Sequence, residues 1–450
     1  MDVRIMARLL WLRRQLRRHE RWVRPQLEAH QARSLAALRQ YAYARSPFYQ
    51  RFHRGLTDRP LPELPVLTKA LAMEHFDELV TDRAIRLRDV EAHLATLQGD
   101  ERFLGRYWLS ATSGSTGRRG LFLSNLAEWI TVLASYARAN DWGGARAGLT
   151  RRMKLAVVST TTPWHQSARV GATLRSWWVP TLRLDATDPT DSVVERLNVW
   201  QPETLVAYAS MARLLAGEQL AGRLRISPRV VFTASEVLTD ETRRRVTEAW
   251  GRAPFNVYAA TESAGIASEC EHHRMHLFED LVIAEVVDEH NRPVSTGLYG
   301  DKVLVTVLFS RTQPLIRYEM SDSLRLGTGG CACGRPFALL DGIQGRAEDV
   351  LHFPAVAGGQ AAIHPNVFHR VMEAAPVAEW QVVQEPDGLH VLLAGSADGS
   401  LADEQLAATL EHELAAQGIV VPRVMVRRVA AIPRTAAGKA PLISSRLPRQ

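Results

Sequence analysis

Residues 107–120 read YWLSATSGSTGRRG, the stretch richest in signs of a binding loop. It combines five serine and threonine hydroxyls with three glycines and two arginines, after a short β-like run and before a helical pattern near Leu126. Glycines let several backbone N–H groups turn toward one anion. A Walker loop is excluded, because no Lys-Ser or Lys-Thr pair follows the last glycine. The stretch predicts a phosphate-binding loop, with a plain Ser/Gly surface loop as the alternative; its expected donors are Ser113, Gly114, Ser115, Thr116 and Gly117.

Composition indicates a globular protein of two or three cooperating units. The chain has 450 residues, 46% hydrophobic and 23% charged, which exceeds the length of one ordinary core. No apolar run approaches the ~18 residues of a membrane-spanning helix, and the N-terminus lacks the pattern of a secretory signal. Three cysteines cannot form a disulfide framework. We therefore expect a soluble, cytoplasmic protein.

Charge is unevenly distributed along the chain, whose formal net charge is +7. Between residues 4 and 24, eight arginines face one acid, Glu20, on a helical pattern with an apolar side. Such a helix is more often packed on its own domain than bound to nucleic acid or lipid. We infer neither a nucleic acid nor a membrane as partner.

Short apolar runs alternate with helical patterns after the loop, the rhythm of a parallel, doubly wound α/β sheet. The expected strands are 153–158, 181–184, 204–208 and 229–233, and the expected helices are 165–178, 190–200, 209–221 and 239–250. Ligands of such sheets bind beyond the carboxyl ends of the strands. Residues 233–236 and 258–263 lie at two of these ends.

Two further units follow. Strand patterns at 281–287 and 302–308 have a turn but no helix between them, which predicts an antiparallel or barrel-like unit. After residues 345–349 a small α+β module of about a hundred residues begins. We predict an α/β fold with two domains: a large one at 1–346, with doubly wound sheets and the barrel-like unit, and a small mobile α+β domain at 349–450.

Five motifs in order across the chain resemble those of the adenylate-forming enzyme superfamily. They are TSGSTG at 112–117, YAATE at 258–262, IRYEMSD at 316–322, GRAED at 345–349 and PRTAAGK at 433–439. Within that superfamily, YARSPFY at 43–49, LPVLTK at 64–69 and CACGR at 331–335 resemble the phenylacetate-CoA ligase branch, whose members activate aryl carboxylates.

The resemblance implies an ATP-dependent ligase that joins an aromatic acid to AMP, releases pyrophosphate and passes the acyl group to CoA. Such a site needs positioned donors, a divalent ion and a mobile cation. Glu262 is the candidate Mg²⁺ ligand, Thr261 would bond the α-phosphate, and Lys439 would swing over the forming acyl phosphate. The expected catalytic residues are Lys439, Glu262, Thr261 and Arg346, and the other expected ATP contacts are Ser235 and Glu236 by the adenine, Tyr258 on its face and Asp322 at the ribose.

Two positions depart from the family pattern. Glu348 stands at the expected hinge, where aspartate is usual, and Ala259 follows Tyr258, where glycine is common. The resemblance implies that the small module rotates about residue 348 between an adenylating and a thioester-forming pose.

A second group of residues predicts a structural zinc site. Cys270 precedes three histidines, His272, His273 and His276, and a Cys-x-Cys pair lies much later, at Cys331 and Cys333. Three thiolates and one imidazole complete a closed tetrahedral site. We favour His276 as the fourth ligand, because similar branch members place a histidine just before the following strand. Three buried free cysteines are the alternative.

The acyl pocket is expected to have walls from 160–165, 208–211 and 259–260. Its predicted contacts are Trp164, His165, Tyr208, Ala259 and Ala260. An amine, a hydroxyl or an acyl carrier protein is the alternative acceptor, as in secondary metabolism, and a homodimer is a further expectation. A catalytically inactive nucleotide-binding regulator is the alternative from another class.

Overall fold

The fold is taken from a computed structural model. It describes residues 3–112, 119–145, 151–174, 176–346, 351–363, 367–368, 371–372, 379–394, 400–435 and 440–447. Within these ranges, no helix combines the length and apolar composition needed to cross a membrane.

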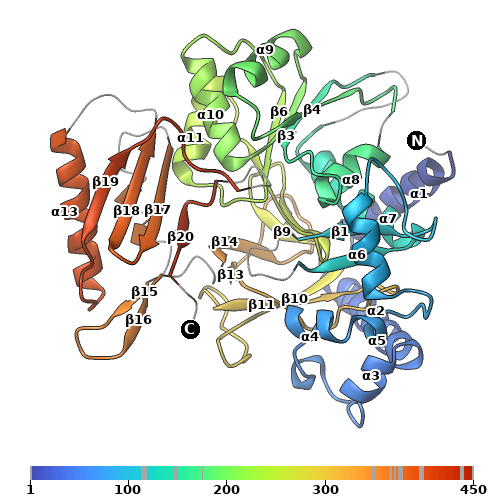
Figure 1. Ribbon diagram of the computed structural model, residues 1–450. Coiled ribbons are helices and arrows are strands. Elements are labelled where there is room, and N and C mark those ends of the chain that lie inside the picture. The colour runs from blue at the N-terminus through green and yellow to red at the C-terminus, as the bar shows by residue number, and fades with distance from the viewer. Residues whose placement is uncertain are drawn as a thin grey trace.

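A mixed nine-stranded sheet forms the centre of the large region (Figure 1). Its parallel half is β4 (Thr181–Asp185), β3 (Leu155–Ser159), β5 (Thr204–Tyr208), β6 (Val230–Ala234) and β7 (Phe255–Ala260). Its antiparallel half is β8 (Ala264–Glu269), β9 (Met275–Leu277), β14 (Leu339–Arg346) and β13 (Asp322–Leu326). The predicted α/β class is confirmed, and the parallel strands lie where their sequence patterns place them.

Helices connect the parallel strands, as the doubly wound pattern requires. They are α8 (Gln166–Thr173), α9 (Thr190–Trp200), α10 (Ala209–Leu220) and α11 (Asp240–Trp250). Only α8 differs clearly from its expected range, since it ends five residues before position 178. The segment that follows turns instead, with Val179 N donating to Ser176 Oγ at 3.2 Å, and Pro180 disfavours a helical residue before it.

The hydroxyl-rich stretch connects the two strands of a hairpin, β1 (Trp108–Ala111) and β2 (Leu121–Ser124). Thr112 N donates to Gly120 O at 2.9 Å, and Gly120 N donates to Thr112 Oγ1 at 2.8 Å. The two ends of the loop are thus held together. The predicted phosphate-binding residues Ser113, Gly114, Ser115, Thr116 and Gly117 lie outside the described residues. Helix α7 (Leu126–Trp142) follows, capped by Asn125, whose Oδ1 accepts from Ala127 N and Glu128 N.

Helices of the N-terminal part cover one side of the large region. They are α1 (Val3–His19), α2 (Arg24–Arg45), α3 (Pro47–Phe52), the 3₁₀ turn Leu61–Glu63, α4 (Lys69–Glu74), α5 (Phe76–Leu79) and α6 (Leu87–Thr96). The basic helix α1 contacts α7 and buries Ile5, Leu9 and Leu16. Packing on its own domain is therefore the observed state of this helix. Thr68 caps α4, as its sequence predicts, accepting from Leu71 N at 3.2 Å.

A separate three-stranded antiparallel sheet follows β9, with β10 (Val282–Val287), β11 (Lys302–Val307) and β12 (Tyr318–Met320). The predicted antiparallel pairing is confirmed. The last two strands of this part, β13 and β14, pair with each other and through β14 with β9, so they extend the central sheet.

The C-terminal region is a small α+β unit with its own core (Figure 1). A hairpin of β15 (Leu351–Pro354) and β16 (Gln360–Ile363) precedes a four-stranded sheet in the order β19-β18-β17-β20. Its other elements are β17 (Glu379–Glu385), β18 (Gly388–Ala394), α13 (Ser400–Ala416), β19 (Val424–Arg428) and β20 (Ile443–Ser445). Residues 347–350 are not described, so the predicted boundary between 346 and 349 stays a prediction.

Candidate active site

One cavity of about 2560 Å³ lies at the carboxyl ends of β6 and β7 and extends to the C-terminal region. Single small-molecule pockets measure about 300–1,000 Å³, so this space can hold several ligands at once. Residues far apart in sequence share its wall, among them Ser235, Glu262, Asp322, Glu379 and Ala440. The predicted ATP contacts of the described residues therefore line the same cavity.

The end of β7 and the turn between β7 and β8 carry five of the predicted residues. Tyr258, Ala259 and Ala260 end β7, and Thr261 and Glu262 form the turn; all five line the cavity. Thr261 O accepts from Gln166 Nε2 at 3.1 Å, which joins the turn to α8. The chain re-enters β8 through Ala264 with φ of 62°, a left-handed conformation that is costly for alanine. The turn that carries Glu262 is thus joined to α8 on one side and enters β8 through a restricted backbone conformation on the other.

Asp322 and Arg346 meet across one strand pair. Asp322 begins β13 and stands opposite Arg346, the last residue of β14. Asp322 lines the cavity. Only the backbone of Arg346 is described, so its predicted catalytic role stays a prediction.

Ser235 and Glu236 follow β6 directly. Ser235 has φ of 70°, so the chain turns sharply at the strand end. Both line the cavity, and Glu236 accepts hydrogen bonds from two backbone N–H groups, those of Ser210 at 2.8 Å and Ala440 at 3.1 Å. The sequence predicted these residues beside the adenine; the structure gives Glu236 two protein partners as well.

Tyr318 is a cavity residue to which the sequence analysis gave no role. Its side chain is 2% exposed, and in the part of the chain that the structure describes its hydroxyl has no hydrogen-bond partner. Burial, with the charges of Glu262 and Glu319, raises its pKa well above the usual value. No alternation in the sequence marks it, because Glu319 and Ser321 line the cavity as well.

The predicted acyl contacts separate into two groups. His165, Ala259 and Ala260 line the cavity, and His165 Nδ1 lies 2.9 Å from Ser167 Oγ. Trp164 and Tyr208 are not among its lining residues. Instead, the guanidinium carbon of Arg119 lies over the Trp164 ring, 4.6 Å from the ring centre.

Tyr208 supports the pocket wall from behind. Its hydroxyl accepts from Thr160 N at 3.1 Å, and burial raises its pKa to about 12. A cavity-lining cation missed by the sequence analysis, Arg183, bonds the carbonyls of Ser167 and Thr160 at 3.1 and 3.4 Å. The Arg183 side chain fits against α8 because residue 171 is glycine. A Cβ at position 171 would lie 1.9 Å from Arg183 Nη1.

Lys439 lies outside the described residues, as does the expected hinge residue Glu348. Thr435 and Ala440, which flank residues 436–439, line the cavity. The segment that contains Lys439 therefore begins and ends beside the predicted ATP contacts.

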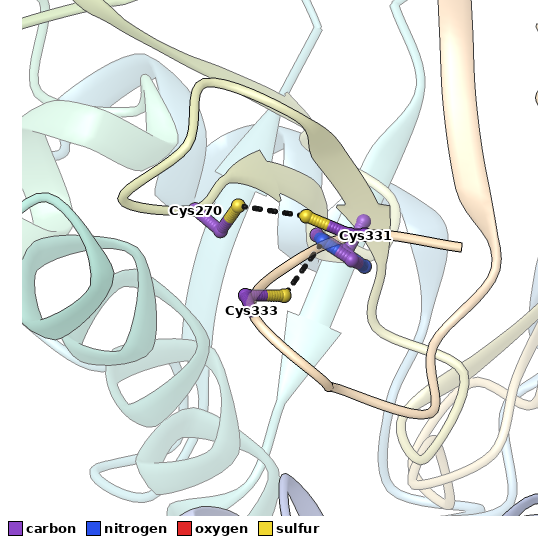
Figure 2. A group of neighbouring side chains, drawn as sticks. Cys270, Cys331 and Cys333 are labelled. Carbon is purple, nitrogen blue, oxygen red and sulfur yellow. Dashed lines mark hydrogen bonds between the residues drawn. The ribbon is translucent and has the colours of Figure 1, made fainter.

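The predicted zinc ligands form a compact cluster at one end of β9 (Figure 2). The ligand atoms of Cys270, His276, Cys331 and Cys333 all lie within 4.8 Å of one another. Cys270 Sγ is 3.6 Å from Cys331 Sγ, and Cys333 Sγ is 3.3 Å from His276 Nε2. The ligands of a tetrahedral zinc lie about 3.5–3.8 Å apart, given bonds of about 2.3 Å to sulfur and about 2.0 Å to nitrogen. The spacing fits a zinc ion and excludes a disulfide.

The surroundings of the cluster also fit a metal. His276 Nδ1 donates to Phe337 O at 3.1 Å, which leaves Nε2 as the ligand atom. Burial lowers the pKa of His276, favouring the neutral imidazole that a metal needs. Burial raises the pKa of the Cys270 thiol to about 12, and a bound cation would reverse this shift. His273 lies elsewhere, stacked on Phe255 and 3.0 Å from Glu269.

Comparison with known proteins gives the family. No protein-family model matches the chain. It is 27% identical over 391 residues to a phenylacetate-coenzyme A ligase of Thermus thermophilus, covering 81% of this chain and 80% of that protein. It is 24% identical over 363 residues to a phenylacetate-coenzyme A ligase of Aromatoleum evansii, covering 76% and 78%. The chain is thus similar over most of its length to phenylacetate-CoA ligases, the branch of the adenylate-forming superfamily that its motifs resemble.

Solved structures show the same fold. A crystal structure of 2-hydroxyisobutyryl-CoA ligase in the postadenylation state, in complex with R3-HIB-AMP, matches with a TM-score of 0.72 at 21% identity, covering 95% of this chain and 92% of that one. The same protein in the thioesterification state gives a TM-score of 0.60 at 21% identity, covering 96% and 92%. The predicted resemblance to the phenylacetate-CoA ligase branch is confirmed, and these relatives support the predicted class, an acid–CoA ligase.

Proposed function

We propose that the protein joins an aromatic carboxylic acid to AMP at the expense of ATP, releases pyrophosphate, and then transfers the acyl group to CoA. The observation that carries this proposal is the single cavity where the β7–β8 turn, the start of β13 and the ends of the Lys439 segment meet. Relatives that the chain matches over most of its length are phenylacetate-coenzyme A ligases, which supports both CoA as acceptor and an aromatic acid as substrate.

The roles of the residues follow from the charges that the reaction brings together. Attack of a carboxylate on the α-phosphorus crowds two anions, and pyrophosphate must leave as a stabilised anion. Glu262 would hold Mg²⁺ with phosphate oxygens and water, Thr261 would donate to the α-phosphate, and Asp322 would accept from the ribose hydroxyls. Tyr258 would present its ring to the adenine, and Lys439 would offset the charge of the forming acyl phosphate.

The two pocket contacts Ala259 and Ala260 lie in the same strand end as Tyr258, so the acid would lie beside the adenylate. His165 would bond the carboxylate or a ring substituent across the cavity. Trp164 and Tyr208 would act behind this wall, by shaping the Thr160–His165 turn. The protein is expected in the cytoplasm, and its oligomeric state stays a prediction.

The cysteine and histidine cluster would hold a structural zinc ion. Cys270 follows β8, which begins just after Glu262, while Cys331 and Cys333 lie between β13 and β14. Four protein ligands close the coordination sphere, so the ion would have no open position for substrate. Its effect would be to tie the strands that carry Glu262 and Asp322 together.

The test is ATP–pyrophosphate exchange over a panel of benzoates, phenylacetates and cinnamates, with short aliphatic acids for comparison. Exchange with an aromatic acid, followed by formation of its CoA thioester, is the expected result. Exchange without CoA consumption, and with consumption of an amine or carrier protein, would replace CoA as the acceptor. Absence of exchange with every acid would contradict the proposal.

A further inference from the structure

Two of the polar contacts between the C-terminal region and the large region lie near Ser210. Ser210 lies in the first turn of α10, where backbone N–H groups have no partner within the helix. Its N–H donates to Glu236 Oε2 at 2.8 Å, and its hydroxyl accepts from Arg434 Nη1 at 3.4 Å. One residue of the large region is therefore bound from two directions.

Glu236 connects this point to the C-terminal region. Its second oxygen, Oε1, accepts from the N–H of Ala440 at 3.1 Å. A carboxylate at the start of a helix is favoured by the helix dipole, so the group is held in place on the α10 side. The left-handed turn at Ser235, φ 70°, aims Glu236 away from the strand and toward this contact. Glu236 thus bonds α10 through Oε2 and the C-terminal chain through Oε1.

Arg434 makes the second connection. Its Nη2 donates to Glu379 Oε1 at 3.4 Å, and both side chains are only 15% exposed. Burial raises the pKa of Glu379, an effect that the cations Arg434 and Arg213 oppose. A half-enclosed pair of this kind is screened less than one at the surface. Arg434 is therefore fixed between its own domain and Ser210.

The two connections lie on either side of one short segment. Arg434 precedes residues 436–439, and Ala440 follows them. Lys439 is thus the residue directly before an N–H that Glu236 accepts. Both ends of the segment are attached to the same point of the large region, beside the β7–β8 turn.

We propose that Glu236 is a positioning residue that anchors the segment of Lys439 for the adenylation half-reaction, with Arg434 as the second anchor. The proposal rests on the proposed function, because it assigns Lys439 to that half-reaction. Thioester formation in this family is expected to use a rotated C-terminal domain, in which these contacts would be absent. The anchor should therefore act on one half-reaction and not on the other.

The experiment measures the two half-reactions separately in the full-length protein. Glu236→Ala should lower the rate of ATP–pyrophosphate exchange at least about 10-fold, since a hydrogen bond to a charged group is lost. Thioester formation, measured as kcat with saturating acyl-adenylate and CoA, should stay within about twofold, because a lost adenine contact would raise only the KM for the adenylate. Arg434→Gln should show the same selectivity with a smaller effect, and the double variant should lose less than the product of the two, because the residues share Ser210.

A matched control separates anchoring from simple loss of a helix cap. Thr239 caps the neighbouring helix α11 and accepts from Thr242 N at 3.1 Å, without a contact to the 434–440 segment among the described residues. Thr239→Ala should lower thermal stability as Glu236→Ala does, and change both half-reactions alike. Equal loss of both half-reactions in Glu236→Ala, or no loss in either, would overturn the proposal.

A second readout does not need activity. The Ala440 amide should exchange its hydrogen slowly in the parent and at least about 10-fold faster in Glu236→Ala, with no change in Thr239→Ala. Unchanged exchange at Ala440 would overturn the anchor. If the parent shows no pyrophosphate exchange with any acid, the proposed function fails, and amide exchange alone decides whether Glu236 holds this segment.

Discussion

The central sheet and the C-terminal region both line the cavity, yet they reach it in different ways. Residues such as Glu262 and Asp322 come from strand ends whose backbones are paired within a nine-stranded sheet. The C-terminal region has a core of its own, and Glu236 and Arg434 mark its polar contacts with the sheet side. Strand pairing fixes the first side, and we predict that the second side is released between the two half-reactions.

The difference indicates a division of labour. Binding ATP needs groups that keep their distances through the whole cycle, which buried strands provide. A lysine that acts in only one half-reaction needs contacts that form and break, and a few hydrogen bonds suffice for that.

Removing the expected mobile cation should affect one half-reaction only. Lys439→Ala should lower pyrophosphate exchange by about 10²–10³-fold, the usual effect of losing one group that stabilises transition-state charge. Thioester formation from supplied acyl-adenylate should be nearly unchanged. Lys154→Ala is the control, because Lys154 bonds Trp200 O at an exposed position far from the segment. Equal losses in both half-reactions would contradict the division.

Removing a zinc ligand should act on the fixed side. Cys270→Ser should remove one bound zinc per chain, measured by elemental analysis, and lower the Tm by about 5 °C or more. Because the ion would brace the strands that carry Glu262 and Asp322, both half-reactions should fall together. If the parent protein contains no zinc, or if the variant keeps the Tm of the parent, the claim that a zinc ion braces these strands is wrong.

Acid should weaken the large region through His53. Burial, with the charge of Arg39 nearby, lowers the pKa of His53 to about 4. The unfolded chain binds this proton near pH 6.5, so the stability contributed is present above pH 6.5 and is lost as the pH falls toward 4. The full loss is about 3 kcal/mol. His53→Phe should flatten the Tm profile between pH 6.5 and 4, and an unchanged slope would count against this assignment.

Tight packing behind the sheet should show at Gly143, the residue that ends α7. A Cβ there would lie 2.5 Å from the ring of Phe232 on β6. Gly143→Ala should therefore destabilise the protein by about 1–3 kcal/mol in urea unfolding. Gly330→Ala is the control, because nothing lies within 4 Å of its added Cβ. Equal stabilities would show that the helix shifts freely over the sheet.

The sequence predicts the strands of the sheet well, because β-branched runs between helical patterns leave little choice of structure. The length of α8 is overestimated, since Trp177 and Trp178 continue an apolar pattern beyond the end of the helix at Thr173. Three histidines next to Cys270 are equivalent in sequence, and only the path of β9 brings His276 to the cysteines. Local sequence therefore predicts neither the end of α8 nor which histidine lies beside the cysteines.

The anchor could not be predicted at all. Glu236 and Ala440 are 204 positions apart, and the contact is to a backbone N–H that every residue except proline offers. The sequence analysis placed Glu236 beside the adenine because it follows a strand end. That reasoning locates the cavity, but it does not locate the contacts that the C-terminal region makes beside it. Tyr318 was missed for a related reason, since its buried hydroxyl is recognised only once the neighbours are known.

The central claim is that the fixed side of the cavity forms an acyl-adenylate with the help of Glu262. The most direct measurement is ATP–pyrophosphate exchange by the parent, by Glu262→Gln and by Glu289→Gln, an exposed control. We predict exchange with an aromatic acid in the parent and in Glu289→Gln, and a loss of at least about 100-fold in Glu262→Gln. Exchange in Glu262→Gln at the rate of the parent would contradict the account.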